Sequence, residues 1–178
     1  MATAAEIVRF WRDAGPKFWF VKDETFDGRC RAFEKDHHAA ARRDLSAWEL
    51  NAEGALALLL LLDQIPRNIF RNTAHAFATD PLAQGVASRA IANGFDAATD
   101  SELRVFFYLP FEHAENAELQ ARAVKLVEQM GDANFLKYAR LHQDIITRFG
   151  RFPHRNACLA RTSTAEELEF LAQGGFSG

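Results

Sequence analysis

The chain has 178 residues, of which 48% are hydrophobic, and its sixteen phenylalanines and three tryptophans supply bulky core material. This composition excludes a disordered chain, and the net charge of −3 excludes a protein that binds nucleic acid through its overall charge. With only five prolines, ten glycines and few β-branched runs, we expect one all-helical domain spanning residues 1–178.

The start of the chain, MATAAEIVRFWRD, lacks the basic segment and apolar core of a secretory signal. The apolar run at 55–62 is far shorter than the ~20 residues that a membrane-spanning helix needs. Cys30 and Cys158 lie far apart, which favours two reduced thiols over a disulfide. We therefore expect a cytoplasmic protein without a membrane segment.

The first two predicted helices have polar caps. Thr3 is placed to cap a helix that runs through Ala14, and Gly15 ends it. After the aromatic connector KFWFV at 17–21, Asp23 or Thr25 can cap a second helix that reaches about residue 43.

The second helix carries Asp36, His37 and His38, a combination that suggests a metal. Neighbouring helical residues point about 100° apart and rarely share an ion. We therefore expect no metal here and interpret the three residues as a solvated face.

In the central stretch LLLLLDQIPRNIFR, residues 58–71, an apolar helix is followed directly by a cluster of polar residues. Asn51 can cap this helix, and the run at 55–62 is apolar on every side, which indicates that other helices surround it. Pro66 allows at most another turn, and a new short helix can start there. The polar groups at this break are Asp63, Arg67, Asn68 and Arg71.

The rest of the chain continues the helical pattern, with Asp80 as a simple cap for one helix and Thr164–Glu167 as a capping box for the last. Further helices are expected at 80–93, 101–108, 116–130, 132–149 and 164–173. Tight turns between them favour antiparallel helix pairs in an αα array or compact bundle. No sequence repeat is evident.

Several motifs together resemble the bacterial domain-of-unknown-function family 924 over nearly the whole chain. They are LLLLLDQIPRNIFR (58–71), AFATDPLA (76–83), FFYLPFEHAEN (106–116) and HQDIITRFGRFPHRNA (142–157). The resemblance implies a fold similar to the tetratricopeptide-like αα superhelix. It implies no activity, because none is assigned to the family.

The same motifs hold polar residues that an average core does not need. Arginine binds carboxylate or phosphate in a bidentate manner, and histidine can carry a proton near neutral pH. We predict ligand-binding roles for Asp63, Arg67, Asn68, Arg71, His142, Arg151, Arg155 and Asn156, and catalytic roles as proton carriers for His113 and His154. No metal or cofactor motif is present.

Each of these residues also has a structural interpretation. Asp63 with an arginine can be a buried structural pair, and His142 on an apolar face can be a core histidine whose hydrogen bonds are satisfied. The six basic residues at 137–161, against one acidic residue, can serve an anion or face the acidic remainder of the chain.

Three hypotheses follow for function. The one we favour is that these residues line one concave pocket for a small phosphorylated or carboxylated molecule, with metal-free acid–base catalysis if the protein is an enzyme. The alternative is a tetratricopeptide-like module that binds a protein or peptide. In the third, the polar cluster only locks the helices together.

Overall fold

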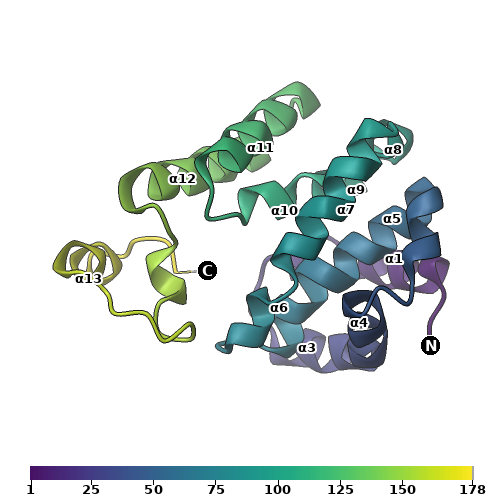
Figure 1. Ribbon diagram of the computed structural model, residues 1–178, viewed down its shortest axis with the longest axis horizontal. Coiled ribbons are helices and arrows are strands. Elements are labelled where there is room, and N and C mark those ends of the chain that lie inside the picture. Colours follow the sequence, from purple (N-terminus) through teal and green to yellow (C-terminus); the bar gives the residue numbers. More distant parts are fainter. Residues whose placement is uncertain (178) are drawn as a thin grey trace. The chain divides into compact units, whose positions relative to one another are not determined.

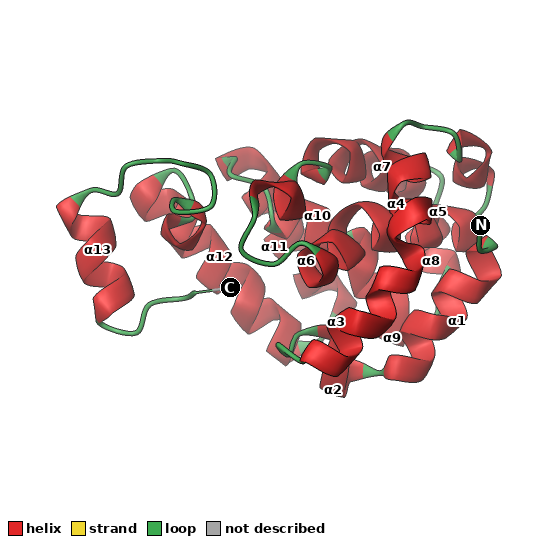
Figure 2. Cartoon of the chain, turned by 90° about the horizontal axis from the view of Figure 1, so that it is seen from below, coloured by secondary structure: helices red, strands yellow, loops and turns green. Residues whose placement is uncertain are grey.

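The computed structural model describes residues 1–177, which form helices joined by turns and loops. Within this range there is no strand (Figures 1 and 2). The protein is therefore all-α, as the sequence predicts. No helix in the described range is both long and apolar enough to cross a membrane.

The contacts divide the chain into two compact units, and each is described by itself. Unit 1 comprises residues 1–71 and 75–110, and unit 2 comprises 72–74 and the residues from 111 onward. The prediction of a single domain stays a prediction.

Unit 1 packs its helices around an aromatic core. Its elements are α1 (Ala4–Ala14), α2 (Pro16–Trp19), α3 (Glu24–Cys30), η1 (Arg31–Phe33), α4 (Glu34–Ala41), η2 (Ser46–Leu50), α5 (Ala52–Leu59), η3 (Leu60–Gln64), α6 (Ile65–Ile69), α7 (Asp80–Ala92), α8 (Phe95–Ala98), α9 (Ser101–Arg104) and η5 (Val105–Phe107), together with most of η4 (Ala74–Phe77). The ring of Trp11 lies 5.7 Å from those of Phe26 and Phe106, measured between centroids. Helix α5 contacts both α1 and α7, so the apolar stretch is surrounded as predicted.

Unit 2 is built on a helical hairpin. Its elements are α11 (Ala117–Met130), α12 (Ala133–Phe149), η6 (Pro153–Arg155) and α13 (Ala165–Ala172), and the short α10 (Leu109–Glu112) spans the boundary between the units. Gly131 adopts the left-handed conformation that ends α11, and Asp132 caps α12 in the next position. As a result α11 and α12 lie side by side (Figure 1).

The helix caps that depend on nearby residues are confirmed. Thr3 and Thr164 each form a capping box with the glutamate three residues later, and the side chains of Asn51 and Asn116 accept from backbone N–H groups at the third position beyond them. Each of these hydrogen bonds closes within one turn, so local sequence determines it.

The structure differs from the sequence predictions in three places. The helix expected from Asp23 to about residue 43 breaks at η1. There the ring centroid of Phe33 lies 4.8 Å from that of Phe10, and this tertiary contact overrides local helix propensity. The connector at 17–21 contains most of α2. Asp80 is not a cap: Thr79 occupies the N-cap position, and the Asp80 carboxylate turns to an arginine instead.

Candidate functional site

The helical break at Pro66 leaves backbone carbonyls that side chains satisfy. Residues 60–64 form a π-helical turn, in which the N–H of Ile65 donates to the carbonyl of Leu60. Because Pro66 has no N–H to donate, the preceding turn lacks one of its usual backbone donors. Two backbone carbonyl oxygens beside the break accept hydrogen bonds from side chains of other segments. The carbonyl of Leu61 accepts from His37 Nδ1 at 2.8 Å, and the carbonyl of Leu62 accepts from Thr79 Oγ1 at 2.5 Å.

Two of the predicted polar residues of this stretch also donate hydrogen bonds to backbone carbonyls near the break. Arg67 Nη1 donates to the carbonyl of Asp63 at 2.6 Å, and Asn68 Nδ2 donates to the carbonyl of Gln64 at 3.1 Å. Two of the residues assigned to ligand binding therefore also hold the backbone of the broken helix.

Arg67 joins two buried carboxylates. Its guanidinium donates to both oxygens of Asp80 at 2.9 Å and lies 3.2 Å from Asp63 Oδ1. Asp63 and Asp80 are 1% and 6% exposed. Burial lowers the pKa of Arg67, but the two carboxylates outweigh that effect and the pKa is raised. This arrangement fits the structural interpretation of the cluster.

Arg71 is held in the same manner by a residue that the sequence did not single out. Its Nε and Nη2 donate to the carboxylate of Asp27 at 2.5 and 2.8 Å, and Nη2 also donates to Asn68 Oδ1 at 3.0 Å. A cavity of about 230 Å³ lies here, lined by Glu24, Asp27, Gly28, Arg31, Asn68, Ile69 and Arg71. Two acidic and two basic side chains share it, so it has no net positive charge for an anion.

In unit 2 most of the basic segment at 137–161 pairs with glutamates of the chain. Arg151 binds Glu167 through two hydrogen bonds of 2.6 and 2.8 Å, which lower the pKa of Glu167 to about 2. Arg161 binds Glu115 at 2.6 and 2.9 Å, and Asn156 bridges Glu167 and Arg161. Arg140 and Arg148 also pair with glutamates. These pairs match the interpretation in which the segment faces the acidic part of the chain.

The histidines of unit 2 gather around aromatic rings. His142 Nδ1 lies 2.8 Å from the carbonyl of Tyr138 and 3.0 Å from Glu112 Oε1. His154 packs near Phe152, and its buried Nδ1 has no hydrogen-bond partner within residues 1–177. Burial lowers the pKa of His154 to about 3, with further lowering from nearby Arg155.

These environments give the histidines different capacities for proton transfer. A histidine with a pKa of about 3 is neutral at pH 7 and a weak base, so His154 is poorly suited to carry a proton. The Glu112 carboxylate and the Tyr138 carbonyl both face His142 Nδ1 and fix the orientation of its ring. His113 lies with its ring centroid 6.2 Å from that of His142.

A second cavity, which the sequence did not predict, lies in unit 1 and has a volume of about 310 Å³. Its floor is apolar and buried, formed by Ala40, Leu58, Leu62 and Val86, and Pro81, Leu82 and Gly85 complete the wall. Its polar residues are Arg43, Ser46, Glu49 and Arg89. Arg89 and Glu49 neutralise each other through hydrogen bonds of 2.6 and 3.0 Å.

Arg43, an exposed residue that lines this cavity, differs from Arg89 in having no carboxylate partner among the described residues. Within residues 1–177 its side chain makes no hydrogen bond or ion pair, whereas the neighbouring Arg42 pairs with Asp44 at 2.9 Å. Its φ of 66° is left-handed, as the end of α4 requires: the N–H of Arg43 donates to Ala40 and that of Asp44 to Ala39. Glycine is the usual residue at such a position, and a left-handed conformation costs other residues about 1–2 kcal/mol.

The sequence-predicted site residues therefore divide between the units. Asp63, Arg67, Asn68 and Arg71 come together at the Pro66 break in unit 1, and His113, His142, Arg151, His154, Arg155 and Asn156 lie in unit 2. That all ten form one pocket stays a prediction. Arg43 was not among the residues predicted from the sequence, because its only local signal is an arginine in the glycine position at the end of a helix.

The prediction of a solvated face at 36–38 is wrong for two of its three residues. Asp36 and His37 are buried, because α4 turns them toward the interior of unit 1, and His38 is partly exposed. Asp36 accepts from the N–H of Ala2, and His37 supports the carbonyl of Leu61.

Comparison with known proteins identifies relatives but no activity. No curated protein matches the chain. The structure of a protein of unknown function, ATU0120 from Agrobacterium tumefaciens, is similar with a TM-score of 0.93 and 53% identity, covering 96% of this chain and 97% of that one. The model of a family described as bacterial protein of unknown function, DUF924, matches residues 7–175. The chain therefore belongs to the DUF924 family.

Proposed function

We propose that the protein binds a small molecule with a carboxylate or phosphate group and an apolar body in the 310 Å³ cavity of unit 1. The volume lies at the lower end of the range for small-molecule sites, and such sites combine apolar walls with a few placed polar groups. The apolar floor would receive the body of the ligand, and the rim would receive its charge.

The observation that carries this proposal is the position of Arg43. Of the basic residues around this cavity, Arg89 is already neutralised by Glu49, and Arg43 supplies the unopposed positive charge. A non-glycine residue in a left-handed conformation is a strain that functional sites commonly retain. A guanidinium kept at this cost and directed at no carboxylate of the chain suits an external anion.

This assignment refines the function expected from the sequence and moves its main anion contact. Arg67, Arg71 and Arg151 each bind a carboxylate of the chain already, so an external anion would have to displace that partner. Proton transfer by His113 or His154, and ligand binding by the other predicted residues, stay predictions.

The test is a thermal-shift measurement with phenyl phosphate and phenylacetate, with phenylacetamide as the uncharged control. A ligand at one hundred times its dissociation constant stabilises a protein by about 2.7 kcal/mol. For a chain of this size that corresponds to a rise in Tm of about 5–10 °C. We expect the anions to raise Tm and the amide to have no comparable effect.

Two variants make the test specific. Arg43→Gly removes the guanidinium and suits the left-handed backbone, so the variant should fold and should lose the response to anions. Arg42→Ala removes the neighbouring, paired arginine and should keep the response. An anion response that survives Arg43→Gly unchanged would refute the proposal.

A tetratricopeptide-like binding module is the second candidate, because the α11–α12 hairpin is the kind of unit from which helical arrays are stacked. It predicts capture of a peptide by the intact protein, with no response to the small anions.

A further inference from the structure

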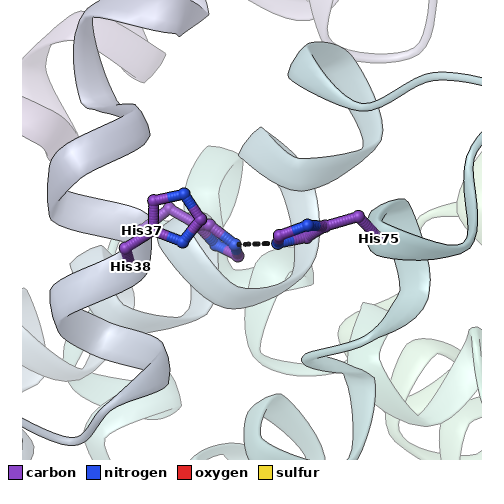
Figure 3. A group of neighbouring side chains, drawn as sticks. All are labelled: His37, His38 and His75. Atoms are coloured by element: carbon purple, nitrogen blue, oxygen red, sulfur yellow. Dashed lines mark hydrogen bonds between the residues drawn. The ribbon is translucent and has the colours of Figure 1, made fainter.

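We propose that His37, His38 and His75 form a binding site for a divalent transition-metal ion of the zinc class. His37 and His38 come from α4, and His75 comes from η4, with its ring turned toward them (Figure 3). One ligand nitrogen from each residue lies within 4.8 Å of the other two. This site is independent of the anion cavity and goes beyond the function proposed above.

The tautomer of His37 is suited to a metal ligand. Its Nδ1 lies 2.8 Å from the carbonyl of Leu61, which can only accept, so Nδ1 carries the proton and Nε2 presents its lone pair. A metal-binding histidine commonly donates its other N–H to a carboxylate or a backbone carbonyl, which fixes the orientation of the ring. The carbonyl that does so here is one of those beside the Pro66 break.

The spacing of the nitrogens fits a tetrahedral ion. His37 Nε2 and His75 Nε2 lie 3.2 Å apart. Two nitrogens that each sit about 2.0–2.1 Å from one tetrahedral zinc are about 3.3 Å apart. A small rotation of His38, which is partly exposed, would bring the third nitrogen into the same geometry.

The surroundings support three ligands and one open position. Phe70 stacks on His75 with ring centroids 3.9 Å apart, which positions that imidazole. Glu34 Oε1 lies 4.0 Å from His38 Nε2 and adds negative charge beside the site. His75 is exposed, so water or another small ligand can reach a fourth position. Three histidines with one open position form a ligand set that zinc proteins use.

The expectation of no metal at these residues rested on two neighbouring histidines considered alone. Rings that point about 100° apart on one helix seldom share an ion. A third histidine from another element can bring them together, because both rings then converge on it. Nothing in the sequence around His75 indicates that pairing.

The test is calorimetric titration of tag-free protein with zinc chloride, after metal is removed with EDTA and dialysis. We expect one zinc ion per chain for wild type. His75→Gln and His38→Gln, which alter exposed or partly exposed side chains, should weaken zinc binding at least tenfold. His113→Gln, in unit 2, is the matched control and should bind zinc as wild type does.

Cobalt substitution gives a second readout, because tetrahedral Co²⁺ absorbs visible light strongly. Wild type loaded with Co²⁺ should show these bands, and His75→Gln should lose them. The proposal is overturned if wild type binds no zinc, which would leave a hydrogen-bonded histidine cluster only, or if His75→Gln binds zinc like wild type. Arg43→Gly should retain the zinc, so failure of the anion proposal would not be confused with failure of this one.

Discussion

Substitution of Arg67 by alanine should destabilise the protein far more than loss of a surface ion pair. The guanidinium makes two hydrogen bonds of 2.9 Å to Asp80 and one of 2.6 Å to the carbonyl of Asp63, and it lies 3.2 Å from the Asp63 carboxylate. Its side chain is 18% exposed. Its removal takes the cation away from two buried carboxylates.

Breaking a buried pair from one side costs about 3–5 kcal/mol. For a chain of this size, 1 kcal/mol corresponds to roughly 2–4 °C, so Tm should fall by about 6–20 °C. The assay is urea unfolding monitored by circular dichroism, with thermal unfolding alongside. Arg89→Ala is the matched control, since it removes an equally bidentate pair whose arginine is 60% exposed and should cost no more than about 1 kcal/mol.

A double-mutant cycle with Asp80→Asn separates the pair from its surroundings. The coupling energy between Arg67 and Asp80 should lie in the upper part of the range of about 0.5–3 kcal/mol seen for residues in contact. If Arg67→Ala costs no more than Arg89→Ala, the cluster does not lock the helical break, and the reasoning from burial is refuted.

Two further predictions follow from local geometry. Gly54→Ala would place a Cβ 2.2 Å from the carbonyl oxygen of Trp48 and should lower the free energy of unfolding by about 1–3 kcal/mol. In Gly28→Ala the new Cβ meets nothing within 4 Å, so this variant should be as stable as wild type or more stable. Chemical unfolding of both variants measures the difference. The pKa of His154 is lowered to about 3, so between that pH and its usual value near 6.5 the unfolded chain binds a proton that the folded one does not. Stability should therefore fall as pH decreases through this window, by up to about 1.4 kcal/mol per pH unit, and His154→Gln should show a shallower slope. Identical slopes for the two proteins would contradict the lowered pKa.

Much of the helical pattern can be predicted from the sequence because its signals are local. The capping box at Thr164 and the left-handed Gly131 depend on residues within one turn. The break at Pro66 is predicted for the same reason, because proline lacks an N–H wherever it occurs. The π-helical turn before it is a detail that the proline alone does not specify.

The partners of the polar residues could not be predicted because they are distant in the sequence. Arg71 binds Asp27, 44 residues away, and Arg161 binds Glu115, 46 residues away. His37 meets His75 across 38 residues. Amino-acid type identifies these side chains as unusual, but only the packing of helices decides whether an arginine faces a carboxylate of the chain or an open cavity, as Arg43 does.

The most direct test of the proposed function is a titration of isotope-labelled protein with phenyl phosphate, followed by two-dimensional amide NMR spectra. The proposal predicts that the largest shifts occur at Arg43, Ser46 and Gly85 around the cavity, and that they disappear in Arg43→Gly. Shifts concentrated at residues 142–156, or around Arg71, would contradict it and place the anion site elsewhere.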